Sequence, residues 1–504
     1  MTIREWRNSF VRVNCVPTDV LSLIPAHLPS QRDRFRASFV CCHWHRTFLH
    51  SAALWSQLDF SRGKVYVKTL LERIKGSTLD IIVNGRVPVG PIALHPPRAK
   101  QIGSLHFACN NWVDVIRRFS EVSSCPLPLL TTLRIATVDE FGTEGPGGEI
   151  PPSLPLFSNA VNLKEFLHSD GTLSLDHFRF PNLTTFGLLA EPEEDFRASQ
   201  LFNFLEASPM LQTVDVKIIA TVAFDGVPER VFILPNVETF SLVVKDFGPD
   251  YEIAAHISCP SARRTSLMHE LYADVMTSQQ ILPSSVSWNT IVHQYTRSPV
   301  EEVTLGMQIT PDPTIICSLT FRSPDTTVIR LGLRLTQHDG HGDGRSEDMY
   351  YNVFSQASRI IRDQLANVRR LHFNHRSRVF GSAHRERIAN EVGQISKSVG
   401  PLEELTFDGC DLRSYLFPFP NLPEMEQSIA FPPIKELTVS HPSPPSWVEC
   451  MAAIVRLAKS QHALGVPFKR VVVRITGHPE TMAGGLRSWV EVVDCYEWLY
   501  METE

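Results

Sequence analysis

The sequence lacks the segments that mark membrane-spanning and secreted proteins. No stretch approaches the roughly 20 uncharged apolar residues of a membrane-spanning helix. The amino terminus, MTIREWRNSF, contains no apolar run typical of a signal peptide. The ten cysteines include no C-x-x-C pair, which argues against a zinc ribbon or a redox motif. We therefore expect reduced thiols, no membrane contact, and a cytoplasmic or nuclear location.

Catalytic and metal-binding motifs are missing as well. There is no G-x-S-x-G, no H-E-x-x-H and no protein-kinase set. The Gly-rich residues 141–150 lack the G-K-[ST] of a phosphate-binding loop. Residues 338–344, HDGHGDG, do not place Asp, Asn and Glu where a calcium loop needs them. No third ligand follows His372 and His375 at a metal-binding spacing, so we expect exposed histidines, no enzymatic activity, no metal and no cofactor.

The composition is that of a globular protein, with 43% hydrophobic and 20% charged residues over 504 positions. That length suits about three domains or one elongated repeat array. The formal net charge of −6 gives no overall basic character, so we predict no nucleic-acid partner. Residues 1–60 differ from the rest, since they carry seven Lys and Arg against four Asp and Glu. Proline is in excess, because 36 residues are about 7% of the chain against a usual 5% or so.

Residues 16–60 predict a small helical module. Pro17 suits the first turn of a helix, and four apolar residues follow it on one face: Val20, Leu21, Ile24 and Leu28. Ser30 is a plausible N-cap for a second helix with an apolar stripe of Phe35, Phe39, Val40 and Trp44. A third helix is expected over residues 52–55. Three short helices make a very small core, so such a module usually needs a partner to cover its apolar surface.

This module resembles the F-box. The resemblance rests on Val16-Pro17-x-Asp19-Val20-Leu21, Val40-Cys41-x-x-Trp44 and Ala53-Leu54-Trp55 in that order. Val16, Cys42 and His45 depart from the residues usual in that family. F-boxes dock on the Skp-family adaptor of a cullin-RING ubiquitin ligase. The resemblance implies adaptor contacts from a set of apolar residues and one arginine, namely Pro17, Val20, Leu21, Ile24, Leu28, Arg34, Val40, Cys41 and Trp44, with Arg32 and Arg36 adding electrostatic steering.

The rest of the chain repeats a six-residue pattern, apolar-x-x-apolar-x-apolar. Eleven copies occur, at 130–135, 163–168, 183–188, 211–216, 237–242, 300–305, 328–333, 368–373, 402–407, 434–439 and 468–473, with a degenerate copy at 262–267. A proline lies one or two residues before eight of them. Since proline is tolerated where a strand begins, each unit predicts a helix or loop, a proline stop and a short strand. The fourth and sixth positions then share one strand face, and stacking the strands in parallel buries them as a column.

These copies resemble the L-x-x-L-x-L segment of leucine-rich repeats, in a degenerate form with irregular periods. Residues 69–85, a helix and then a strand, look like the opening unit and resemble the region after the F-box in the large fungal F-box families. The expected fold class is α/β. We expect an N-terminal extension (1–15), an F-box-like module (16–60), a parallel-stranded repeat solenoid (61–475) with a helix over 446–463, and a C-terminal helical cap (476–504).

The fifth position of each copy points away from the core. Most of these residues are small, neutral or apolar, and they form neither a Lys/Arg ladder for phosphates nor an aromatic series for bases. A protein or peptide is therefore the expected ligand, and the predicted substrate-binding residues are those of the middle copies: Asp215, Ser241, Thr304, Gly332, His372 and Thr406. The hypothesis is the substrate-recognition subunit of a Skp–cullin–F-box ubiquitin ligase. The alternative is a non-ligase interaction scaffold whose helical module only caps the solenoid.

Overall fold

The computed structural model is mixed α/β. It describes residues 16–28, 31–60, 64–74, 76–84, 99–108, 126–136, 156–169, 174–190, 195–219, 221–223, 231–245, 251–272, 294–295, 299–309, 314–324, 328–336, 345–376, 382–410, 412, 431–440, 447–475 and 485–497. The chain divides into two compact units. Unit 1 comprises Met1–Val214 and Ala223–Val227, and unit 2 comprises Asp215–Val222 and Pro228–Glu504. The predicted N-terminal extension, Ser30 and the glycine-rich segments 141–150 and 338–344 lie outside the described residues.

The described part of unit 1 begins with four helices: α2 (Thr18–His27), α3 (Gln31–Ser38), α4 (Cys42–His50) and α5 (Ala52–Trp55). The single second helix expected through Phe35 and Trp44 was wrong, because the chain is extended at Cys41 and a separate helix, α4, begins at Cys42. At 100° per residue, two side chains nine positions apart would lie about 180° apart on one helix. The break lets both face inward, so that Phe35 packs on Trp55 at 5.7 Å between ring centroids and Trp44 packs on Phe48 at 5.4 Å.

The helical module, residues 16–60, has a small but closed core. Leu21, Phe48 and Leu54 are 0% exposed. The indole Nε1 of Trp55 donates to the Leu49 carbonyl at 3.0 Å. The Arg73 guanidinium, from α6 (Lys64–Arg73), lies 4.7 Å from the centre of the Trp55 ring and joins the module to the next helix.

The strands of unit 1 follow sequence order in a parallel sheet. They are β1 (Gln57–Asp59), β2 (Leu79–Asn84), β3 (Ile102–Ala108), β4 (Thr132–Ala136), β5 (Glu165–Ser169) and β6 (Thr185–Ala190). The opening helix and strand expected within residues 69–85 are confirmed by α6 and β2. Shorter elements follow, namely η3 (Leu175–His177), β7 (Asp195–Arg197) and α9 (Ala198–Glu206). The boundary between the units falls within β8 (Thr213–Ile218), and β9 (Thr221–Ala223) comes next.

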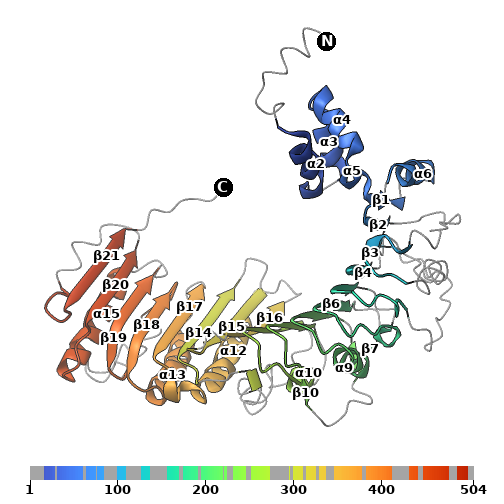
Figure 1. The fold of residues 1–504 in the computed structure, drawn as a ribbon. Helices are drawn as coiled ribbons and strands as arrows, with labels where there is room; N and C mark the ends of the chain where they lie inside the picture. Colours follow the sequence, from blue (N-terminus) through green and yellow to red (C-terminus); the bar gives the residue numbers. More distant parts are fainter. Residues whose placement is uncertain are drawn as a thin grey trace, which may run out of the picture. The chain divides into compact units, whose positions relative to one another are not determined.

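Unit 2 contains a larger, mostly parallel sheet. Its strands run in the order β11 (Thr239–Lys245), β13 (Arg264–Tyr272), β16 (Val328–Thr336), β15 (Thr314–Arg322), β14 (Glu302–Ile309), β17 (Arg370–Arg376), β18 (Leu402–Asp408), β19 (Ile434–Ser440), β20 (Arg470–Ile475) and β21 (Val492–Glu497). Three long helices, α12 (Arg345–Arg362), α13 (Ser382–Ser398) and α15 (Trp447–Ala463), lie on one side of it (Figure 1). The smaller elements are β10 (Phe232–Ile233), α10 (Tyr251–Ala255), β12 (Ile257–Ser258) and η5 (Leu365–Asn367).

The order of β14, β15 and β16 corrects the expectation of an all-parallel array. β15 pairs antiparallel with both of its neighbours, and β16 rather than β14 lies beside β13. Only four residues separate β14 from β15, and five separate β15 from β16. Because a parallel crossover needs about a dozen residues or more, connections this short allow only an antiparallel meander.

The core prediction from the repeats is confirmed. Each of the eleven copies lies on a strand, and all of its fourth- and sixth-position side chains are buried. Neighbouring copies align in register, as in the row Leu371, Leu405, Leu437 and Val471 across β17 to β20. Burying each such side chain contributes about 1.5–3 kcal/mol to folding. Stacking therefore supplies the core that no single unit could form.

Asparagines reinforce the strand starts in unit 1. The amide Nδ2 of Asn162 donates to the Pro128 carbonyl at 2.7 Å, and that of Asn182 donates to the Val161 carbonyl at 2.9 Å. Each donor directly precedes one copy, and each acceptor lies two residues before the preceding copy. These side chains link successive units where the leading prolines cannot donate a backbone hydrogen bond.

The C-terminal part confirms one expectation and corrects another. The helix expected over residues 446–463 is α15. The expected helical cap was wrong over Val492–Glu497, which forms β21 and pairs in parallel with β20. Val493 and Cys495 lie two residues apart on either side of Asp494, which is the period of a strand. They pair with Val471 and Val473 and so extend the inward column. Of the helices in the described residues, none combines the length and apolar character needed to cross a membrane.

Candidate functional site

Exposed apolar side chains concentrate on the helical module. Of the fourteen large apolar side chains exposed among the described residues, five belong to it: Val20, Leu23, Phe39, Val40 and Leu49. Phe39 is 73% exposed and Leu23 is 61% exposed. An apolar surface on so small a module is typical of a docking site.

The structure separates the predicted adaptor-binding residues into two groups. Pro17, Val20 and Val40 are exposed, and Ile24, Leu28, Arg34 and Cys41 are half-buried. The other two, Leu21 and Trp44, are buried in the core of the module, where they cannot reach a partner without unfolding it. Leu23 and Phe39 were missed as contacts. Leu23 follows Val20 at a spacing of three, which is a helical neighbour position and could have indicated it.

Arg34 has structural contacts of its own. Its Nε donates to the Leu28 carbonyl at 3.3 Å. Its charge also acts on Asp80 of β2, where burial raises the pKa of the carboxyl group and Arg34 partly opposes that rise. The arginine therefore helps to hold the module on the first strands of unit 1.

The predicted substrate-binding residues lie on strands of unit 2, with a different grouping from the one expected. Thr304, His372 and Thr406 are adjacent in register on β14, β17 and β18. Asp215 is exposed on β8 and Ser241 is half-buried on β11. Gly332 is buried, because Met268 of β13 covers it, and a Cβ there would lie 3.0 Å from the Met268 Cε.

The outward face of β17 to β21 carries a groove. The strand groove, as we call it, has a volume of about 420 Å³ and eleven lining residues: His372, Glu404, Thr406, Asp408, Glu436, Thr438, Ser440, Arg470, Val472, Arg474 and Tyr496. Most of them were missed, although the signal was present in the copies. The two-residue period that exposes the fifth position also exposes the third and the seventh. The charged lining residues occupy third positions (Glu404, Glu436, Arg470) and seventh positions (Asp408, Arg474).

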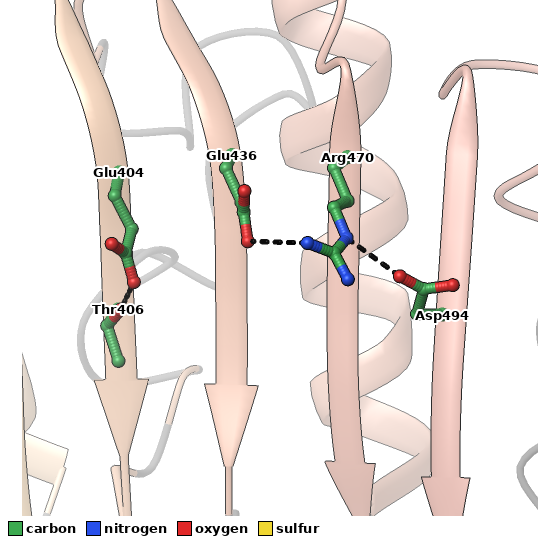
Figure 2. Close-up of polar contacts among 5 residues, drawn as sticks. All are labelled: Glu404, Thr406, Glu436, Arg470 and Asp494. Atoms are coloured by element: carbon green, nitrogen blue, oxygen red, sulfur yellow. Dashed lines mark hydrogen bonds and ion pairs between the residues drawn. The ribbon is translucent and has the colours of Figure 1, made fainter.

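Ion pairs order one row of the strand groove. Arg470 Nε lies 2.7 Å from Asp494 Oδ2, and Arg470 Nη1 lies 3.7 Å from Glu436 Oε1 (Figure 2). The hydrogen bond to Asp494 raises the pKa of the guanidinium. The Thr406 hydroxyl donates to Glu404 Oε1 at 2.9 Å. Arg474 forms no ion pair with any described residue, so its guanidinium is available to a ligand.

Two polar atoms in the strand groove are buried without a partner. They are His372 Nε2 and Asp408 Oδ1, for which no hydrogen bond is formed among the described residues. Burial lowers the pKa of His372, while Glu404 and Glu302 act in the opposite direction. A neutral imidazole can donate or accept a hydrogen bond through Nε2, depending on its tautomer.

Glu302 anchors the neighbouring part of the same face. It is only 8% exposed and lies between two arginines, with Oε1 3.0 Å from Arg322 Nη1 and Oε2 3.6 Å from Arg370 Nε. A carboxylate with so little solvent needs such partners. These arginines are therefore engaged with the protein itself.

His375 corrects the expectation of exposed histidines. It points into the core, is 3% exposed, and shares a 2.5 Å hydrogen bond between its Nε2 and the Tyr350 hydroxyl of α12. Burial lowers the pKa of His375 to about 3. Across the described segments, no three His, Cys, Asp or Glu side chains are placed to hold a metal ion.

Comparison with known proteins adds no family to these observations. No protein-family model matches the chain, and no curated protein shows significant similarity to it.

Proposed function

We propose that the chain is the substrate-recognition subunit of a Skp–cullin–F-box ubiquitin ligase. The helical module is an F-box that binds the Skp-family adaptor, and the strands carry degenerate leucine-rich repeats whose outward face binds a protein target. The chain performs no covalent chemistry in this function. It holds the target near the charged ubiquitin-conjugating enzyme that the rest of the complex supplies, so its contribution is proximity.

The concentration of exposed apolar side chains on the helical module carries the proposal. Leu23 and Phe39 each expose most of a large apolar surface, and burying such a side chain contributes about 1.5–3 kcal/mol. The buried side chains Leu21, Trp44 and Phe48 form the core of the module itself. A partner surface is the remaining way to cover the exposed group.

The second candidate, a scaffold whose module only caps the sheet, is favoured by a different observation. β1 follows α5 directly and pairs in parallel with β2, with Leu58 opposite Ile81. The module therefore also closes the first edge of the sheet in unit 1. Adaptor binding separates the two functions, because a cap needs none.

The test is the affinity of the full chain for a purified Skp-family adaptor, measured by calorimetry. We expect Leu23→Glu and Phe39→Glu each to weaken binding roughly thirtyfold or more, since interface anchors cost about 2 kcal/mol or more when removed. Val161→Glu is the matched control, because Val161 is 55% exposed in unit 1 and lies outside the module. Circular dichroism checks that all three variants fold. Absence of binding, or equal binding by all variants, would favour the scaffold.

A further inference from the structure

The strand groove has a floor and two walls, each formed by one row of side chains across neighbouring strands. The floor consists of His372, Thr406, Thr438 and Val472. One wall is the row Glu404, Glu436 and Arg470, all three of which Figure 2 shows. The other wall is the row Asp408, Ser440, Arg474 and Tyr496. The groove therefore runs across the strands rather than along them.

The charges in the two walls change sign together along the groove. Both walls carry a carboxylate at β18, namely Glu404 and Asp408, and both carry a guanidinium at β20, namely Arg470 and Arg474. The two strands are separated by β19, so the opposite charges lie about 10 Å apart at the usual spacing of 4.7–4.9 Å or so between strands. The groove is thus acidic at β18, and its basic end rests on Arg474, because Arg470 is already paired with Glu436 and Asp494.

The lining favours a polar, extended occupant. Small-molecule sites are mostly apolar, whereas the apolar members here are Val472 and Tyr496. The carboxylates at β18 would repel a nucleic-acid backbone. The floor offers hydroxyl groups and the unpartnered His372 Nε2, which can pair with peptide N–H and C=O groups.

We propose that the strand groove binds an extended segment of a protein target that carries a basic and an acidic side chain about three residues apart. This inference rests on the proposed function, since it names the target chemistry of the repeat face. An extended chain advances about 3.3 Å per residue, so three residues span the distance from β18 to β20. Side chains three residues apart in an extended chain point to opposite sides, so the basic one meets Glu404 in one wall and the acidic one meets Arg474 in the other, whose charge no described residue neutralises. Tyr496, half-exposed, closes the basic end.

The probe is a set of four fluorescent nine-residue peptides of Gly, Ala and Thr, measured by anisotropy against the full chain. One carries Lys and Glu three residues apart, one carries them adjacent, and two carry either two Lys or two Glu three residues apart. We expect the first to bind at least tenfold more tightly than the others, and its advantage to shrink at high salt. Equal binding by all four, or binding by none, would overturn the inference.

Reversing the charge of one groove residue tests whether that residue pairs with a charged side chain of the peptide. Arg474→Glu should make the two-Lys peptide the tightest ligand, and Glu404→Arg should favour the two-Glu peptide. Arg263→Glu is the control, because Arg263 is exposed in unit 2 and does not line the groove. Unchanged selectivity in Arg474→Glu would contradict the assignment. Adaptor affinity measured on the same samples distinguishes the two claims, because an intact adaptor interaction without peptide selectivity refutes this inference alone.

Discussion

Leu21 and Leu23 lie two positions apart on α2 and should respond oppositely to truncation. Leu21 is 0% exposed and Leu23 is 61% exposed. Replacing a buried leucine with alanine costs about 2.7–5 kcal/mol. A module of some 45 residues, at about 0.05–0.15 kcal/mol per residue, has only about 2–7 kcal/mol to lose. Leu21→Ala should therefore open most of the helical module, whereas Leu23→Ala should change its free energy of unfolding by less than about 0.5 kcal/mol.

Amide hydrogen exchange measures this directly. In Leu21→Ala we expect exchange in α2 and α4 to accelerate roughly a hundredfold or more, because 1.4 kcal/mol corresponds to a factor of about ten. In Leu23→Ala the exchange rates of α2 and α4 should change by about twofold or less. In both variants the exchange rates of strands β14 to β20 should stay as in the wild type. Native exchange rates in α4 of Leu21→Ala, or equal acceleration by both variants, would refute the placement of these two side chains. A docking test must accordingly use the exposed residues.

Three further predictions concern stability. Burial lowers the pKa of His375 from 6.5 to about 3, so as the pH falls the unfolded chain binds this proton before the folded chain does. The free energy of unfolding of the wild type should therefore decrease by up to about 1.4 kcal/mol for each unit that the pH falls between 6.5 and 3. Urea titrations of His375→Phe should lack this contribution, and the same pH dependence in both proteins would contradict the prediction. Burial raises the pKa of Asp80 from 3.8, so the unfolded chain releases this proton first and the fold loses stability as the pH rises from about 3.8 to the raised pKa. Asp80→Asn should therefore melt at a higher temperature than wild type at pH 7, and a lower melting temperature would be the wrong sign. Asn182→Ala should cost unit 1 about 1 kcal/mol in urea by removing the bond to the Val161 carbonyl, whereas a neutral result would show that water replaces it.

The sequence predicted the core well because its signal is local and periodic. Leu371 and Leu405 are identifiable from spacing alone, and the leading prolines mark where the strands of eight copies begin. β15 was missed for the opposite reason. Ile315, Cys317, Leu319 and Phe321 alternate as a buried strand should, but they do not fit the six-residue pattern that defined the copies. β16 lies beside β13 because the short connections fold β14, β15 and β16 into an antiparallel meander. The repeat pattern does not encode the lengths of these connections.

The site was predictable only in part, since it depends on combinations across strands. The outward direction of Thr304, His372 and Thr406 follows from alternation within each copy. Their neighbours Glu404 and Arg474 follow from the same alternation, but their grouping into charged walls depends on the register between strands separated by some 30 residues. In the helical module, the sequence showed which residues are apolar, and only packing distinguishes the buried Leu21 from the exposed Leu23.

The most direct test of the central claim is the hydrogen-exchange footprint of a saturating Skp-family adaptor on the full chain. The account predicts protection confined to α2, the connection at Phe39 and Val40, and the start of α4, with no change in β14 to β21. Protection of the strands with an unchanged helical module, or no protection anywhere, would contradict it.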